Sequence, residues 1–231
     1  MSQTYESKIA EAIKVLQEHI GAKGLNVTLA FSHQSEDAIA ISLAQKAGID
    51  FDVFTLDTHK LFAESHAYEK EIESFFGITI QRFSASDDAI ATLEAKVGEY
   101  GIFDDISLRK ECCHVRKIMP LREALKNYDG WISGIRIAQS ITRSDTHLKE
   151  FDENFKLLKF NPLAFFSDEE VERYMAEYVI PKNALYTKGF KSIGCKPCTR
   201  AVKEGEDIRA GRWWWENPEH KECGLHLHQK D

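Results

Sequence analysis

The sequence lacks any segment that could carry the chain across a membrane. No apolar run approaches the roughly 20 residues that span a bilayer. The opening residues, MSQTYESKIAEAIKVL, contain no basic stretch followed by an apolar core, which is the pattern of a secretory signal. We therefore expect a cytoplasmic protein without a membrane partner.

The chain also has fewer basic than acidic residues. The 30 Lys and Arg residues are outnumbered by 37 Asp and Glu residues, which gives a formal net charge of -7. Such a surface repels nucleic acid, so general nucleic-acid binding is not expected. Any anionic ligand must instead be met by bases that cluster locally.

Cysteine is scarce and odd in number, with five in 231 residues. An odd number disfavours a disulfide framework and favours metal binding with one thiol left over. Cys112 and Cys113 are adjacent, and Cys195 and Cys198 form a Cys-x-x-Cys that begins 82 positions later (195 minus 113). The fifth, Cys223, lies in the final stretch KECGLHLHQKD.

The adjacent pair helps to distinguish between metals. Neighbouring cysteines are poorly placed to serve one tetrahedral zinc ion together, whereas a multi-iron cluster offers separate irons to adjacent thiolates. We therefore predict that Cys112, Cys113, Cys195 and Cys198 hold one 4Fe-4S cluster. The alternatives are a structural zinc, a redox-active Cys-x-x-Cys of the thioredoxin type, and four buried free cysteines.

Strand-like and helix-like patterns alternate along the first part of the chain. The strand candidates are 26–31, 52–58, 77–83 and 129–136, and the helical patterns are 4–20, 36–47, 61–76, 87–97 and 106–126. This alternation predicts an α/β fold with a Rossmann-like, mostly parallel sheet and helices on both faces. Ligands in such sheets bind beyond the carboxyl ends of the strands, where the polar turns SHQSED, LDTHK and GIRIAQS lie.

The pattern changes after residue 150. KEFDENFKLLKFNPL indicates a loop or hairpin, and SDEEVERYM indicates a helix with Ser167 as its N-cap. We assign residues 1–205 to a nucleotide- and cluster-binding domain and residues 206–231 to a mobile C-terminal tail. Buried structural cysteines are rare at frayed chain ends, so Cys223 is interpreted as a mobile reactive thiol.

Four stretches resemble one known family: CCHVRKIMPL, GIRIAQSITRSD, SIGCKPCTRAVKEGEDIRAGRWWWE and KECGLH. They are similar to the assimilatory adenylyl-sulfate reductases, the cluster-bearing branch of the phosphoadenylyl-sulfate reductase family. The resemblance implies an adenine nucleotide alpha-hydrolase-like fold. It also implies an oxidoreductase of sulfate assimilation and cysteine biosynthesis, which converts adenosine 5'-phosphosulfate to sulfite and AMP.

The resemblance assigns the chemistry to the tail. Cys223 would attack the sulfur of adenosine 5'-phosphosulfate and expel AMP, leaving an enzyme S-sulfocysteine. Thioredoxin or a similar dithiol would then attack Cys223 and release sulfite. We expect His226 to raise the thiolate fraction of Cys223. The cluster would have a structural and electrostatic role, since the dithiol supplies both electrons.

The phosphosulfate carries negative charge, so its pocket needs fixed cations. Lys117 follows Cys113 by four residues and on a helix would share its face, and the resemblance ties such a lysine to a link between cluster and substrate. The resemblance also implies that the substrate is bound by further basic residues: Arg143, Arg209, Arg212 and Arg136. Arg136 is the weakest of these candidates.

Nucleotide recognition is expected from the turns SHQSED and LDTHK. We carry Ser32 and Asp57 forward as substrate-binding residues. The family commonly has glycine in both turns, whereas this chain has His33 in the first and His59 in the second. The backbone is therefore less certain to approach the ligand closely at these two positions.

Three rival readings stay open from the sequence. The same chemistry could act on 3'-phosphoadenylyl sulfate, which would need a basic contact for the 3'-phosphate. An ATP-pyrophosphatase-type enzyme that thiolates RNA has a similar fold, but SHQSED is not its Ser-Gly-Gly-x-Asp-Ser loop. The third reading is a non-catalytic zinc or cluster protein. A homo-oligomer is left open.

Overall fold

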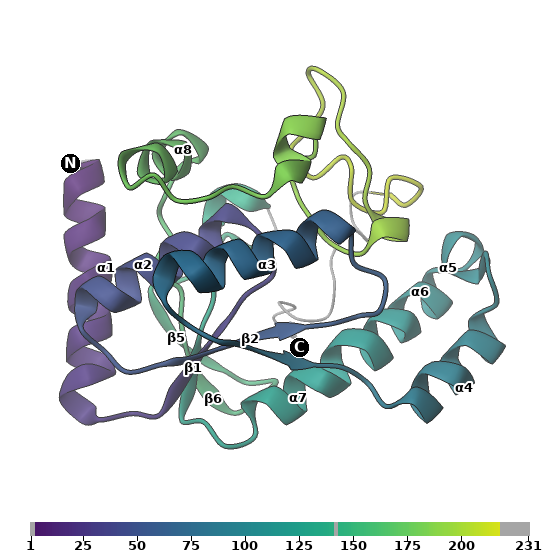
Figure 1. Ribbon diagram of the computed structural model, residues 1–231, viewed down its shortest axis with the longest axis horizontal. Coiled ribbons are helices and arrows are strands. Elements are labelled where there is room, and N and C mark those ends of the chain that lie inside the picture. Colours follow the sequence, from purple (N-terminus) through teal and green to yellow (C-terminus); the bar gives the residue numbers. More distant parts are fainter. Residues whose placement is uncertain (1–2, 141–142, 218–231) are drawn as a thin grey trace.

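The computed structural model describes residues 3–140 and 143–217 of the chain. Its centre is one sheet of six strands in the order β3-β2-β1-β4-β6-β5 (Figure 1). All neighbouring strands are parallel except β5 and β6, which form an antiparallel pair at one edge. The strand bounds are β1 Val27–Ala30, β2 Asp52–Leu56, β3 Ile80–Phe83, β4 Gly130–Ile132, β5 Lys149–Asp152 and β6 Leu157–Phe160.

Helices connect the strands. The α-helices are α1 Tyr5–His19, α2 Ser35–Ala47, α3 Ala63–Phe76, α4 Asp87–Val97, α5 Gly101–Asp104, α6 Ile106–Cys113, α7 Met119–Leu125 and α8 Asp168–Glu177. The short helices are η1 Gly21–Lys23, η2 His114–Ile118, η3 Ile137–Gln139, η5 Ala184–Lys188 and η6 Lys196–Cys198. Ser167 is the N-cap of α8 as predicted, since its side chain accepts a hydrogen bond from the N–H of Glu170.

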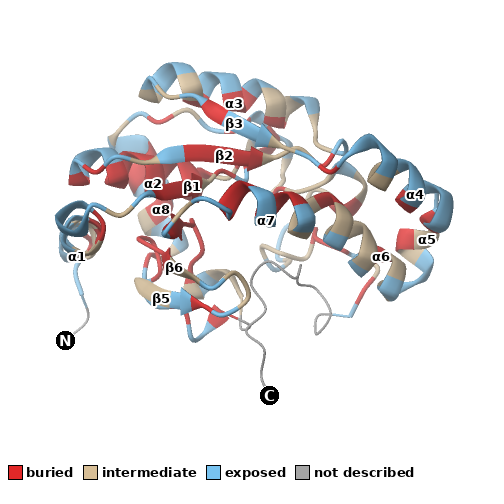
Figure 2. Ribbon diagram, turned by 90° about the horizontal axis from the view of Figure 1, so that it is seen from below, coloured by how far each residue is buried: buried red, intermediate tan, exposed pale blue. Residues whose placement is uncertain are grey.

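The sheet buries a separate hydrophobic cluster on each face. Alternate residues of a strand point to opposite faces. Val53 of β2 and Ile132 of β4 accordingly pack with α1, α2 and α8, while Phe54 and Trp131 pack with α7. In Figure 2 the sheet is seen with α7 on its near side. These layers confirm the predicted α/β architecture.

The predicted helix over 106–126 is wrong in its middle. The chain leaves α6 at Cys113, forms the π-helical turn η2, and re-enters an α-helix at Met119. Pro120 explains the break, because it has no N–H to donate to the carbonyl of Arg116 four residues earlier. A π-turn widens the helix at that point, and such turns are frequent at functional sites.

The predicted strand over 129–136 is shorter than expected. Only Gly130–Ile132 pairs in the sheet, and the chain then leaves it at Ser133. The residues after β4 lie on the wall of a pocket instead. Within the described residues, no helix has the length and apolar character needed to cross a bilayer.

Candidate active site

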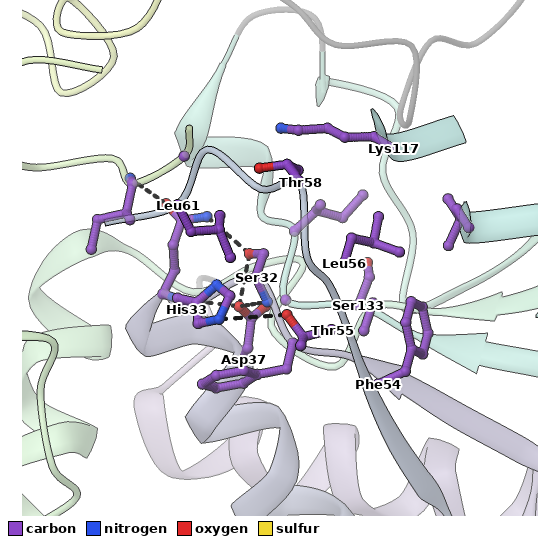
Figure 3. Close-up of a pocket in the computed structure, with 18 of the residues that line it drawn as sticks. Ser32, His33, Asp37, Phe54, Thr55, Leu56, Thr58, Leu61, Lys117 and Ser133 are labelled. Atoms are coloured by element: carbon purple, nitrogen blue, oxygen red, sulfur yellow. Dashed lines mark hydrogen bonds between the residues drawn. The ribbon is translucent and has the colours of Figure 1, made fainter. Parts of the chain in front are cut away.

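A pocket opens at the carboxyl ends of β1, β2 and β4 (Figure 3). The order of the strands reverses here. The chain runs from β1 outward through β2 to β3 and then returns to form β4 on the other side of β1. Such switch points are where ligands bind in open α/β sheets. Its polar lining includes Ser32, Gln34, Thr55, Thr58, Ser133 and Gln139.

The turn between β1 and α2 is held by Asp37. Its Oδ2 accepts hydrogen bonds from the backbone N–H of Ser32 at 2.7 Å, the Ser32 hydroxyl at 2.8 Å and the Gln34 N–H at 3.2 Å. Burial raises the pKa of Asp37 to about 7, although the bonds from Ser32 and Gln34 oppose this shift. Asp37 was not predicted; an acid three residues after an N-cap is the signal that could have identified it.

The two histidines in the turns adopt the conformation that usually selects glycine. His33 has φ 68° and His59 has φ 56°. The turns therefore keep a left-handed residue even though glycine is absent. His33 is buried and lines the pocket, whereas His59 is exposed.

The second turn does not present Asp57 to the pocket. The carboxylate of Asp57 accepts a hydrogen bond from the N–H of His59 at 2.9 Å, and Asp57 is absent from the lining. Thr58, which the sequence analysis missed, lines the pocket instead. Its hydroxyl oxygen accepts a hydrogen bond from Cys195 Sγ at 3.3 Å, and its carbonyl accepts one from Arg116 at 2.8 Å.

A second cavity brings the four predicted metal ligands together. Cys112 and Cys113 end α6, Cys195 precedes η6 and Cys198 ends it, and all four line this cavity. None of the four forms a disulfide with another described cysteine. The N–H of Lys196 donates to the carbonyl of Lys60 at 2.7 Å, which fixes the Cys-x-x-Cys loop to the turn after β2.

Burial dominates the electrostatics of the thiols. It raises the pKa of Cys198 to about 12, with Cys195 and Cys113 adding to the shift. It also raises the pKa of Cys112, against the opposing charge of Arg116. Thiolates are the metal-binding form, so metal binding here would release protons.

The donor set fits a cluster better than a single ion. Across residues 3–140 and 143–217, no three His, Cys, Asp or Glu side chains converge as one ion requires. Four thiols spread around one cavity suit a group with several metal centres. Bases on the wall suit an anionic group: Lys60, Arg109, Arg116, Lys117 and Lys196.

Two residues belong to both cavities. Lys117 and Cys195 line the pocket at the strand ends and also the cysteine cavity. In Figure 3 the Lys117 side chain extends past Thr58 at the rim of the pocket. Lys117 lies in the π-turn rather than in the regular helix assumed from its spacing to Cys113.

The predicted arginines have different positions. Arg143 lines the pocket and donates to Gln139. Arg209 lines neither cavity, and its N–H donates to Asp207 at 2.8 Å. Arg136 is buried away from the pocket lining, where it pairs with Glu36 at 2.8 Å and Asp168 at 2.6 Å.

Arg212 is packed directly behind the pocket wall. It donates to the carbonyl of Ile193 at 2.9 Å, and its guanidinium lies 4.6 Å from the ring centroid of Trp213. Gly194 lines the pocket, and a Cβ atom there would lie only 2.5 Å from the guanidinium carbon. Glycine is therefore required for Arg212 to approach so closely.

A buried ion pair braces the cysteine cavity. Arg109 donates to both carboxylate oxygens of Glu216, at 2.8 and 2.7 Å, and both side chains are 1% exposed. The ring of Trp213 lies within 5 Å of both guanidinium groups, at 4.9 Å from Arg109 and 4.6 Å from Arg212. The backbone N–H of Trp213 donates to the carbonyl of Cys198 at 3.1 Å. Residues 212–216 thus pack against the cysteine loop and α6.

The two predicted catalytic residues, Cys223 and His226, lie outside the described residues. Their assignment therefore stays a prediction.

Comparison with known proteins gives consistent matches. The profile of the phosphoadenosine phosphosulfate reductase domain matches residues 26–201. The adenosine 5'-phosphosulfate reductase of Allochromatium vinosum is 39% identical, over 97% of this chain and 88% of its own. The enzyme of the same name from Agrobacterium fabrum is 45% identical, over 83% of this chain and 74% of its own.

Solved structures share the fold. The phosphoadenylyl-sulfate reductase of Candida auris, solved as a phosphate complex, matches with a TM-score of 0.65 at 20% identity and covers 87% of this chain and 99% of its own. Yeast FAD synthetase in complex with FAD has a TM-score of 0.62 at 13% identity, with coverage of 87% and 70%. The predicted adenine nucleotide alpha-hydrolase-like fold and the predicted family are confirmed, and the chain belongs to the phosphoadenosine phosphosulfate reductase family.

Proposed function

We propose that the chain reduces adenosine 5'-phosphosulfate to sulfite and AMP in sulfate assimilation. The observation that carries the proposal is the wall shared by the two cavities, where Lys117 and Cys195 line both. Four cysteines thereby adjoin a pocket at the nucleotide-binding edge of the sheet. The relatives named adenosine 5'-phosphosulfate reductase support the choice of substrate.

The pocket offers charges suited to a phosphosulfate. Lys117 and Arg143 contribute cations to its lining, and Arg212 lies directly behind Gly194. Fixed cations bind the anionic substrate and stabilise the phosphate that leaves with AMP. We assign these three to substrate binding. Of the four further substrate-binding candidates named from the sequence, Ser32 lines the pocket and the other three do not: Arg209, Asp57 and Arg136.

The four cysteines are assigned to one 4Fe-4S cluster. Cys112 and Cys113 on α6 would bind it from one side, and Cys195 and Cys198 around η6 from the other. When bound, the cluster supplies a covalent brace between these segments and a fixed charge beside Lys117. The chain's own contribution is to desolvate this group and surround it with bases.

The reaction is assigned to residues of the C-terminal segment, 206–231. The Cys223 thiolate would attack the substrate sulfur, so that an S–S bond forms as the S–O bond to phosphate breaks and AMP leaves with the electron pair. A thiolate of an external dithiol would then attack Cys223 Sγ, and sulfite would leave with its electron pair. The second thiol of the dithiol then attacks this mixed disulfide, so that Cys223 leaves as a thiolate and the dithiol closes to its own disulfide, which accounts for both electrons.

His226 would assist by favouring the thiolate of Cys223. A thioredoxin-type reductant and a cytoplasmic location stay predictions of the sequence analysis, as does the boundary at residue 205.

The proposal is tested by incubating anaerobically purified protein with adenosine 5'-phosphosulfate and no reductant, followed by intact mass measurement. We expect a gain of one sulfite unit, absent in Cys223→Ser protein that retains its iron. An adduct formed only with 3'-phosphoadenylyl sulfate would reassign the substrate. No adduct with either nucleotide, from iron-loaded protein, would contradict the function.

A further inference from the structure

His33 needs support to keep its backbone conformation. A residue other than glycine rarely adopts φ near +68°, even though histidine tolerates it better than most. His33 follows β1 directly and precedes α2, in the turn that presents Ser32 and Gln34 to the pocket. A shift at this position would therefore move the pocket wall itself.

The support comes from a buried polar cluster around Glu69. His33 Nε2 lies 3.5 Å from the Thr55 hydroxyl (Figure 3). It also lies 3.5 Å from Glu69 Oε2, and the His33 ring packs edge-on to Phe31. His33 is 2% exposed and Glu69 is 1% exposed. A histidine buried beside a carboxylate has little freedom to move away from it.

Glu69 is itself fixed from a second side. Its Oε1 accepts a hydrogen bond from Arg82 Nε at 2.7 Å, and His66 Nδ1 lies 3.9 Å from its other oxygen. Although burial by itself raises the pKa of Glu69, the hydrogen bonds from His33 and Arg82 outweigh burial and leave that pKa below its ordinary value. The side chain is thus an ionised carboxylate that links α3 and β3 to the β1–α2 turn.

We propose that Glu69 is a positioning residue for nucleotide binding, which acts by holding His33 in the left-handed conformation and so fixing the β1–α2 turn. The inference rests on the proposed nucleotide pocket. Glu69 lies outside that pocket's lining and acts through His33. The geometry of His59 provides a contrast, because that residue has a similar φ but an exposed side chain.

The test is a double-mutant cycle on the cluster-loaded protein. Glu69→Leu removes the acceptor and fills the space with an apolar side chain, and Arg82 can turn to solvent. We expect it to weaken AMP binding about ten-fold by calorimetry and to raise the KM for adenosine 5'-phosphosulfate similarly, with kcat changed less than about two-fold. Glu71→Leu, at an exposed position of the same helix, is the matched control.

The same change in a His33→Gly background separates positioning from general stability. A glycine at this position adopts a positive φ without a side-chain anchor, so adding Glu69→Leu should change the AMP dissociation constant less than about two-fold there. An equal loss in both backgrounds would assign Glu69 to the packing of α3 and β3 and overturn the proposal. An unchanged affinity in the wild-type background would also overturn it.

Two readouts keep the inference separate from the proposed function. Hydrogen exchange of the amides in residues 32–35, without nucleotide, should accelerate in Glu69→Leu protein but not in the His33→Gly background. That result stands even if the protein turns over no sulfonucleotide, which would count against the proposed function alone. If Glu69→Leu protein fails to fold, His33→Ala is compared with His33→Gly: faster turn exchange in the alanine variant is expected, and equal exchange would contradict the anchor.

Discussion

The proposed nucleotide pocket is assembled from strand ends that the hydrogen bonds of the sheet hold in register, whereas the cysteine cavity is assembled from helix ends and a loop. β1, β2 and β4 are neighbours, so their following turns must meet. Cys112 near the end of α6 and Cys198 at the end of η6 line one cavity, and the buried pair of Arg109 and Glu216 joins α6 to the segment after the cysteine loop. The hydrogen bonds between strands therefore hold the pocket together, whereas contacts between individual side chains hold the cavity together.

The largest expected effect separates the two regions directly. Cys198→Ser removes one of the four proposed cluster ligands, so we expect loss of iron and at least about a 100-fold loss of sulfite formation. AMP binding should change far less, because the strand ends stay in place. Iron content, activity and calorimetry measure this; Cys223→Ser is the control that should keep its iron. Intact activity in iron-free Cys198→Ser protein would refute the assignment.

Breaking the buried ion pair should destabilise the cavity side of the molecule. Glu216→Ala leaves the Arg109 charge buried without its carboxylate, which costs about 3–5 kcal/mol of unfolding free energy. Glu111→Ala, which removes the more exposed pair with Lys96, should cost less than about 1 kcal/mol. Denaturant unfolding measures both, and equal costs would show that Glu216 is not a brace.

The pocket side should respond to pH through Asp37. Its pKa in the folded protein is about 7, above the ordinary value of 3.8, so the neutral form stabilises the fold fully below about pH 4. This stability is lost as the pH rises through 7, by about 1.4 kcal/mol for each unit between the two values. Asp37→Asn should lack this slope in unfolding experiments from pH 4 to 8; an unchanged slope would assign it to another group.

The smallest effect is expected at the exposed histidine of the second turn. His59→Gly relieves a positive φ but gives the unfolded chain more freedom, so the unfolding free energy should change by less than about 1 kcal/mol. Thermal unfolding measures the change. A loss well above that value would mean that the His59 side chain has a structural partner.

The sequence predicted the sheet well because apolar strands and helical periodicity are local signals. The turns at the strand ends followed from them, and Ser32 does lie in the pocket lining. The helix break at Pro120 was missed because the helical pattern continues through it. Asp57 was expected in the pocket because it lies in the polar turn LDTHK, but its carboxylate accepts a hydrogen bond from the N–H of His59, and Thr58 lines the pocket instead.

The long-range pairs could not be predicted. Four cysteines indicated a common site by their chemistry, whereas nothing in the spacing of Arg109 and Glu216 or of His33 and Glu69 marks them as partners. Arg136 is a further example. The family resemblance named it as a substrate-binding candidate, but nothing in the sequence indicated its ion pairs with Glu36 and Asp168. Such contacts depend on how distant elements pack.

The central claim is that the cysteine cavity and the nucleotide pocket act as one site through Lys117. The most direct measurement is the Mössbauer spectrum of iron-loaded Cys223→Ser protein with and without adenosine 5'-phosphosulfate, since we expect this variant to bind the substrate without reacting. The account predicts a spectral change on binding that is lost in the additional Lys117→Ala variant. A Mössbauer spectrum that is the same with and without the nucleotide would contradict the account.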